Sequence, residues 1–92
     1  MNTIHIVGLG PGDPRQVTLE TRELLASGLP VILRTRHHPS AQALAPAATG
    51  CDDLYRSGAG FEAVYSAVAE RVCSAASAGD VVFAVPGHPL FA

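Results

Sequence analysis

Two loops rich in glycine and proline contain the residues best suited to contact a small ligand through the main chain. The first, Gly8–Pro14, reads GLGPGDP, and the second, Pro86–Pro89, reads PGHP. Each follows a short apolar run. Glycine lets a ligand approach the backbone closely, and proline holds a loop in one conformation before binding. The two loops are therefore the first candidates for a binding site, with a tight turn that binds nothing as the alternative for each.

The first loop does not match the common nucleotide-binding motifs. A dinucleotide fingerprint requires glycine where Asp13 stands, and an acidic residue at the end of the next strand, where the chain instead reads Arg34-Thr35-Arg36. A Walker A loop requires lysine, and the chain has none. We therefore do not expect a dinucleotide. A phosphate held by this loop and the N-terminus of the following helix is an alternative.

The remaining polar residues favour no metal site and no acid–base pair. His37 and His38 are neighbours, and their side chains diverge in an extended chain, so a solvated loop is favoured over a shared metal. Asp52 and Asp53 are neighbours too, which favours a turn or cap role. Arg34 remains, with His37, as a candidate contact for anionic groups of a substrate.

Composition excludes several classes of protein. The net charge is −2 and every basic residue apart from histidine is arginine, so no basic surface for nucleic acid is expected. Cys51 and Cys73 are too few for a metal cluster or a disulfide scaffold, which favours a reduced, cytoplasmic setting. No apolar run approaches the ~20 residues of a membrane helix, so no membrane partner is expected.

The elements that must position the two loops alternate between strand and helix. A parallel α/β sheet with flanking helices is therefore predicted. The carboxyl ends of parallel strands share one edge, so we expect both loops to meet there. Residues 49–55 are ambiguous and are compatible with a short strand. The predicted strands are Thr3–Val7, Val31–Thr35 and Val81–Val85, and the predicted helices are Val17–Ala26, Ser40–Ala45 and Phe61–Ala78.

The longest predicted helix also predicts part of the core. Phe61, Val64, Tyr65, Val68 and Val72 recur at helical spacing and are expected to face the sheet. The apolar run near the end of the chain requires cover on both of its faces. At 92 residues the chain makes one domain or part of one. We expect the first part of a longer domain, with exposed apolar surface that favours self-association.

Taken together, these motifs resemble the start of the tetrapyrrole (corrin/porphyrin) methylases. The likeness is closest to the subgroup fused to MazG-type nucleotide pyrophosphohydrolases, in which histidine is usual at the position of His88. It covers essentially the whole chain. The stretches that carry it are Gly8–Pro14 with Val17–Leu19, Arg34–Pro39, Asp52–Tyr55 with Phe61–Tyr65, and Phe83–Leu90.

The resemblance implies a two-lobed α/β domain that binds S-adenosylmethionine between its lobes. Residues 1–92 would then be the N-terminal lobe, without the C-terminal lobe. The cofactor contacts implied by the family are Pro86, Gly87, His88 and Pro89. The acceptor contacts that we expect are Gly10, Pro11, Gly12 and Asp13, with Arg34 and His37.

The implied function is methyl transfer to a tetrapyrrole-like or unknown small acceptor. Methyl transfer from a sulfonium is an in-line displacement that depends on positioning, so no covalent nucleophile is required. A homodimer, and possible fusion to a pyrophosphohydrolase domain, are also implied. The alternative is a non-catalytic ligand-sensing or dimerisation module of a MazG-type nucleotide pyrophosphohydrolase.

Overall fold

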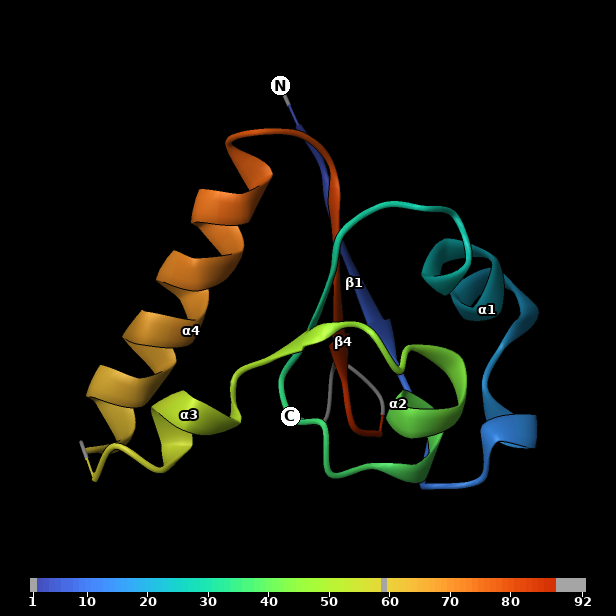
Figure 1. Ribbon diagram of the computed structural model, residues 1–92, viewed down its shortest axis with the longest axis horizontal. Helices are drawn as coiled ribbons and strands as arrows, with labels where there is room; N and C mark the ends of the chain where they lie inside the picture. The colour runs from blue at the N-terminus through green and yellow to red at the C-terminus, as the bar shows by residue number, and fades with distance from the viewer. Residues whose placement is uncertain (1, 59, 88–92) are drawn as a thin grey trace.

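Four parallel strands form one sheet with helices on both faces, as the computed structural model shows (Figure 1). The structure describes residues 2–58 and 60–87. The strands are β1 (Ile4–Gly8), β2 (Val31–Leu33), β3 (Thr49–Gly50) and β4 (Val81–Val85). The helices are the 3-10 turn η1 (Pro14–Gln16), α1 (Leu19–Leu25), α2 (Pro39–Leu44), α3 (Asp52–Tyr55) and α4 (Phe61–Ala76). The predicted α/β class is confirmed.

The strand order is β1-β4-β2-β3, so the last strand along the chain is central. Val82 of β4 lies beside His5 of β1 on one side of the strand and beside Val31 of β2 on the other side. Helices cover both faces of this strand, which explains why Val81–Val85 is continuously apolar.

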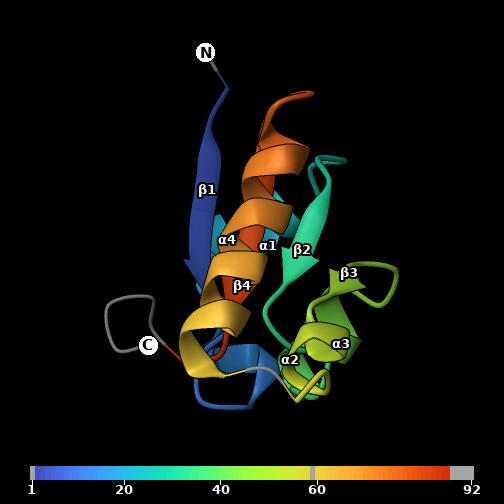
Figure 2. The same ribbon diagram turned by 90° about the vertical axis from the view of Figure 1, so that its left-hand side faces the viewer.

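The helices divide between the two faces according to the direction of each crossover. α1 and α2 lie on one face and α4 on the other (Figures 1 and 2). In the strand order, the connections from β1 to β2 and from β2 to β3 move across the sheet in one direction. The connection from β3 to β4 moves across it in the opposite direction. Right-handed crossovers place helices on opposite faces when the direction reverses.

Side chains of alternate strand residues fill two apolar clusters, one on each face. The cluster under α1 and α2 contains Val7, Leu9, Leu33, Val82 and Ala84. The cluster under α4 contains Ile32, Val64, Val68, Val72 and Val81. In the part of the chain that the structure describes, no helix is long and apolar enough to cross a bilayer.

Two predicted boundaries were wrong for local reasons. The first long helix begins at Leu19 rather than Val17, because Thr18 Oγ1 accepts a hydrogen bond from Thr21 N–H at 3.2 Å and caps the helix there. The second strand ends at Leu33, and Thr35 Oγ1 donates to Asp52 Oδ1 at 2.5 Å instead of continuing the strand.

The predicted burial of two aromatic residues was also wrong. Phe61 is 74% exposed and Tyr65 is 43% exposed, and their rings pack edge to face with centroids 4.4 Å apart. The N-terminal part of α4 diverges from the sheet (Figure 1), and the buried residues of this helix are Val64, Val68 and Val72.

Candidate functional site

The two glycine-proline loops are joined directly to each other at the carboxyl ends of β1 and β4. Gly10 N–H donates to Gly87 O at 3.2 Å, and Gly87 N–H donates to Gly10 O at 3.0 Å. Just before this bridge, Leu9 is fully buried and its N–H donates to Val85 O at 2.8 Å. The expectation that both loops meet at one edge of the sheet is confirmed.

Glycine is needed at both bridging positions. Gly10 has a φ of 70° and Gly87 a φ of 69°, which side-chain-bearing residues rarely adopt. These conformations let each loop turn out of its strand and still pair with the other. The paired amides hold the loops together, however, and are not available to a ligand. This corrects the simple expectation that both loops present bare peptide groups.

His38 is a third member of the bridge, so the solvated loop expected for His37 and His38 was wrong for His38. Its ring is buried, and Nε2 lies 3.0 Å from Gly10 O. Nδ1 accepts a hydrogen bond from Ser40 N–H at 3.1 Å and so caps the N-terminus of α2. Since Nδ1 accepts, Nε2 must carry the hydrogen and donate to Gly10 O. The one sequence signal for its capping role was its position directly before Pro39. Proline is common at the first position of a helix, and the residue before it is then the N-cap.

A cavity of about 450 Å³ lies beside the bridge, along the outer edge of β1. This volume is within the range of small-molecule sites. Thr3 O accepts from Val81 N–H and Leu9 N–H donates to Val85 O, so the odd-numbered residues of β1 direct their peptide groups toward β4. The N–H and C=O groups of the even-numbered residues Ile6 and Gly8 therefore point away from β4. No described strand pairs with them. Residues lining the cavity include Ile6, Gly8, Gly10, Pro11, Thr18, Glu20, Thr21 and Gly87.

The residues around this cavity fit a ligand with polar, apolar and cationic parts. A Cβ placed on Gly87 would meet no atom of the described residues within 4 Å, which leaves space for a ligand against the backbone. The free peptide groups of Ile6 and Gly8 can pair with polar ligand atoms, and the Glu20 carboxylate complements positive charge. S-adenosylmethionine has all three characters.

Only some of the predicted site residues line this cavity. Gly10, Pro11 and Gly87 do, whereas Gly12 and Asp13 lie just outside its lining. The carboxylate of Asp13 accepts from Arg15 N–H at 2.9 Å, caps η1 and forms an ion pair with the Arg15 guanidinium at 2.9 Å. These contacts hold the pKa of Asp13 below its ordinary value. His88 and Pro89 lie outside the described residues, and Pro86 directly precedes Gly87.

The two predicted anion contacts are separate from the loops. Arg34 lines a cavity on the α4 face, whereas Gly10 lines the cavity at the edge of β1. His37 is exposed, and its backbone N–H donates to Thr35 Oγ1 at 3.0 Å. The structure therefore divides the predicted substrate contacts between two places.

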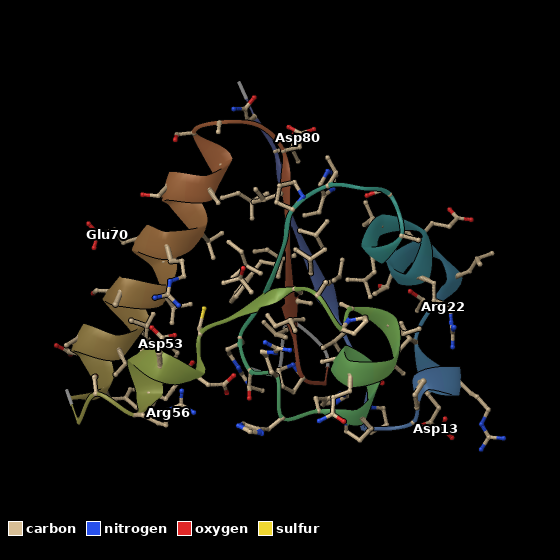
Figure 3. The ribbon with its side chains drawn as sticks, viewed as in Figure 1. Asp13, Arg22, Asp53, Arg56, Glu70 and Asp80 are labelled. Atoms are coloured by element: carbon tan, nitrogen blue, oxygen red, sulfur yellow. The ribbon has the colours of Figure 1, made fainter. Side chains whose placement is uncertain are left out.

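The adjacent aspartates have structural partners, as the turn or cap interpretation predicted. Asp52 accepts from Thr35 Oγ1 and, at 2.9 Å, from Arg36 N–H. Burial alone would raise the pKa of Asp52, but these hydrogen bonds outweigh it and lower the pKa. Asp53 lies on the α4 side of the sheet and Asp13 on the α1 side (Figure 3). Across residues 2–58 and 60–87, no three His, Cys, Asp or Glu side chains gather as a metal site.

Comparison with known proteins agrees with this geometry. The family model of the tetrapyrrole (corrin/porphyrin) methylases matches residues 3–92. YabN of Bacillus subtilis (strain 168), an uncharacterised protein, is 40% identical over 92 aligned positions, and the match covers 97% of this chain. The chain spans 19% of the length of that curated relative. This chain belongs to the tetrapyrrole (corrin/porphyrin) methylase family, whose members generally use S-adenosylmethionine.

Proposed function

We propose that this chain is the N-terminal lobe of an S-adenosylmethionine-dependent methyltransferase that acts on a tetrapyrrole-like or other small acceptor. The observation that carries the proposal is the hydrogen-bonded pairing of Gly10 and Gly87 beside a cavity of about 450 Å³. Membership of the methylase family supports it.

In this proposal the chain contributes position rather than a covalent nucleophile. Bound S-adenosylmethionine supplies an electrophilic methyl carbon. The four residues of the second loop, Pro86, Gly87, His88 and Pro89, would hold the donor. Residues 10–13 would line the acceptor side. The Gly10–Gly87 bridge would fix the two loops relative to each other, and so orient donor and acceptor for an in-line displacement.

We further propose that a second lobe completes the pocket, because the cavity is open along the edge of β1 that no described strand pairs with. A homodimer and a cytoplasmic location belong to the same proposal, supported by the exposed side chain of Ile6 and by the free thiols of Cys51 and Cys73. Fusion to a MazG-type pyrophosphohydrolase domain stays a prediction of the sequence.

The proposal is tested by calorimetric titration of S-adenosylhomocysteine into the full translated product of the gene and into the 92-residue chain. We expect micromolar binding to the full product and binding about 100-fold weaker to the chain, because part of the pocket is missing. Gly87→Asn tolerates the positive φ but adds a side chain in the open space, and should weaken binding about tenfold. Gly79→Ala, at the opposite end of the sheet, is the matched control.

Failure of the full product to bind at millimolar ligand would defeat the methyltransferase proposal. It would favour the non-catalytic sensing or dimerisation module instead. Protection against heat by a nucleotide, without protection by S-adenosylhomocysteine, would favour a phosphate site at the first loop.

A further inference from the structure

The two contacts of the buried His38 ring require the neutral form of the imidazole. Nε2 lies 3.0 Å from Gly10 O, and Nδ1 accepts a hydrogen bond from Ser40 N–H at 3.1 Å. One ring nitrogen therefore donates while the other accepts, a combination that the charged imidazolium does not have. Gly10 and Gly87 line the cavity at the edge of β1, whereas His38 does not. An effect of His38 on a ligand in that cavity is therefore transmitted through Gly10.

Protonation of the ring would place a hydrogen on Nδ1, directly facing the Ser40 N–H. Two donors cannot form a hydrogen bond, so this contact would be lost. Ser40 is fully buried, so its N–H cannot turn to solvent for another partner. The ring would then turn away from Ser40, and turning withdraws Nε2 from Gly10 O. Histidine ordinarily changes charge between pH 5 and pH 8, so a modest change of pH brings this about.

The ring has no acidic hydrogen-bond partner among the described residues. The charged groups of the first loop and η1 are Asp13 and Arg15, which form an ion pair with each other at 2.9 Å. The pKa of Asp13 is held below its ordinary value by Arg15, so its charge is constant over the range in which histidine titrates. Arg22 of α1 donates to Pro14 O. None of these groups substitutes for the contacts that the neutral ring makes.

The other basic groups next to the ring have separate environments. Arg36 and His37 directly precede His38. The guanidinium of Arg36 donates to Pro46 O at 3.1 Å, and His37 is exposed. His88 follows Gly87 in the sequence and lies outside the described residues. A comparison of two proteins that differ only at position 38 cancels the titration of His37 and His88.

We propose that His38 is a positioning residue for the ligand at the loop bridge, which holds Gly10 in its binding geometry when the ring is neutral and releases it when the ring is protonated. The inference rests on the proposed function, since its ligand is the S-adenosylmethionine of that proposal. It adds regulation by pH to a site that has no titratable group in the bridge itself, because Gly10 and Gly87 contribute only main-chain groups.

The test is calorimetric titration of S-adenosylhomocysteine into the full translated product of the gene at pH 8 and at pH 5. Affinity should fall about tenfold on acidification, which is the scale of one lost hydrogen bond. His38→Asn offers Ser40 N–H an amide oxygen at both pH values but does not reach Gly10 O. Its affinity should be about tenfold below that of the unmodified protein at pH 8 and should be the same at both pH values.

His37→Asn is the matched control, and it should retain the decline on acidification because His37 is exposed. An affinity of the unmodified protein that does not change with pH would overturn the proposal. A decline that His38→Asn shares would also overturn it, because another group would then be responsible.

A measurement without ligand separates this inference from the proposed function. Amide hydrogen exchange at Gly87, followed by mass spectrometry, should be about tenfold slower in the unmodified protein than in His38→Asn at pH 8, and equal in the two proteins at pH 5. Taking the ratio of the two rates removes the intrinsic effect of pH on exchange. Absence of binding would defeat the proposed function, whereas a ratio that is the same at both pH values would defeat control of the bridge by His38.

Discussion

At the scale of single residues, one buried histidine joins three segments of the chain. His38 caps α2 through Nδ1 and contacts Gly10 O through Nε2, the same oxygen that accepts from Gly87 N–H. The first contact gives the Ser40 N–H at the start of α2 a partner, and the second adds a further hydrogen bond to Gly10 O. The geometry of the loop bridge therefore depends on a side chain that lies outside both loops.

Substitution of His38 separates its two roles. His38→Ala should lower the free energy of unfolding by about 1–3 kcal/mol, because both the helix cap and the contact with Gly10 are lost. His38→Asn should recover about 1 kcal/mol, since the amide oxygen can accept from Ser40 N–H. Urea denaturation measures both values.

The contact with Gly10 has its own readout. Amide hydrogen exchange at Gly87 should be faster in both His38 variants, because neither side chain reaches Gly10 O. His37→Ala is the control, since His37 is exposed and directly precedes His38. Unchanged exchange at Gly87 in His38→Ala would show that the bridge does not depend on the histidine.

At the scale of elements, an arginine of α4 fastens the short helix α3 and strand β3. Arg71 Nη1 donates to Asp53 Oδ1 at 2.8 Å and to Gly50 O at 3.1 Å, and Nη2 donates to Asp53 Oδ2 at 2.9 Å. The hydrogen bonds from Arg71 lower the pKa of Asp53 from 3.8 to about 2. This clamp holds α3, which carries Tyr55, and β3 against α4.

The clamp should make stability depend on pH in the acidic range. The pKa of Asp53 is lower in the folded state, so its contribution is complete above the unfolded value near 3.8 and is lost as pH falls through about 2. The unmodified chain should therefore melt at a higher temperature than Asp53→Asn at pH 7, with the difference declining between pH 4 and pH 2.

Thermal denaturation across this pH range, at low and high salt, measures the effect. The pair is exposed, so the difference should be modest and smaller in high salt. Glu70→Gln provides the control, since Glu70 is an exposed acid next to Arg71 that points away from the sheet. A difference between Asp53→Asn and the unmodified chain that stays constant down to pH 2 would contradict the assignment.

At the scale of the whole molecule, one edge of the sheet has no partner among the described residues. β1 pairs with β4 on one side, and the alternate peptide groups of Ile4, Ile6 and Gly8 point to the other side. The Ile6 side chain, which also lines the cavity on the α4 face, is 58% exposed. Unpaired edges with apolar side chains favour association with another strand.

We expect the isolated chain to self-associate through this edge. Ile6→Lys should shift sedimentation velocity profiles toward monomer, because a charged edge residue opposes strand pairing. Leu19→Lys is the control, since Leu19 is 71% exposed on α1 and lies outside the edge. A monomer in the unmodified chain, or association that Ile6→Lys does not change, would count against the expectation.

Local sequence patterns determined most of the fold. The apolar run Val81–Val85, the spaced valines of α4 and the glycine-proline loops specified the elements, because periodicity and backbone preferences act over a few residues. Alternation of strand and helix then predicted a parallel sheet and the meeting of both loops at one edge.

Only the tertiary structure decided what each residue does in the site. His38 and Gly10 are 28 positions apart, and their contact depends on where β2 and α2 lie in the sheet. The exposure of Phe61 follows from the angle of α4, and the separation of Arg34 from Gly10 follows from the face to which each belongs. Packing between distant segments sets these features, and no local pattern records it.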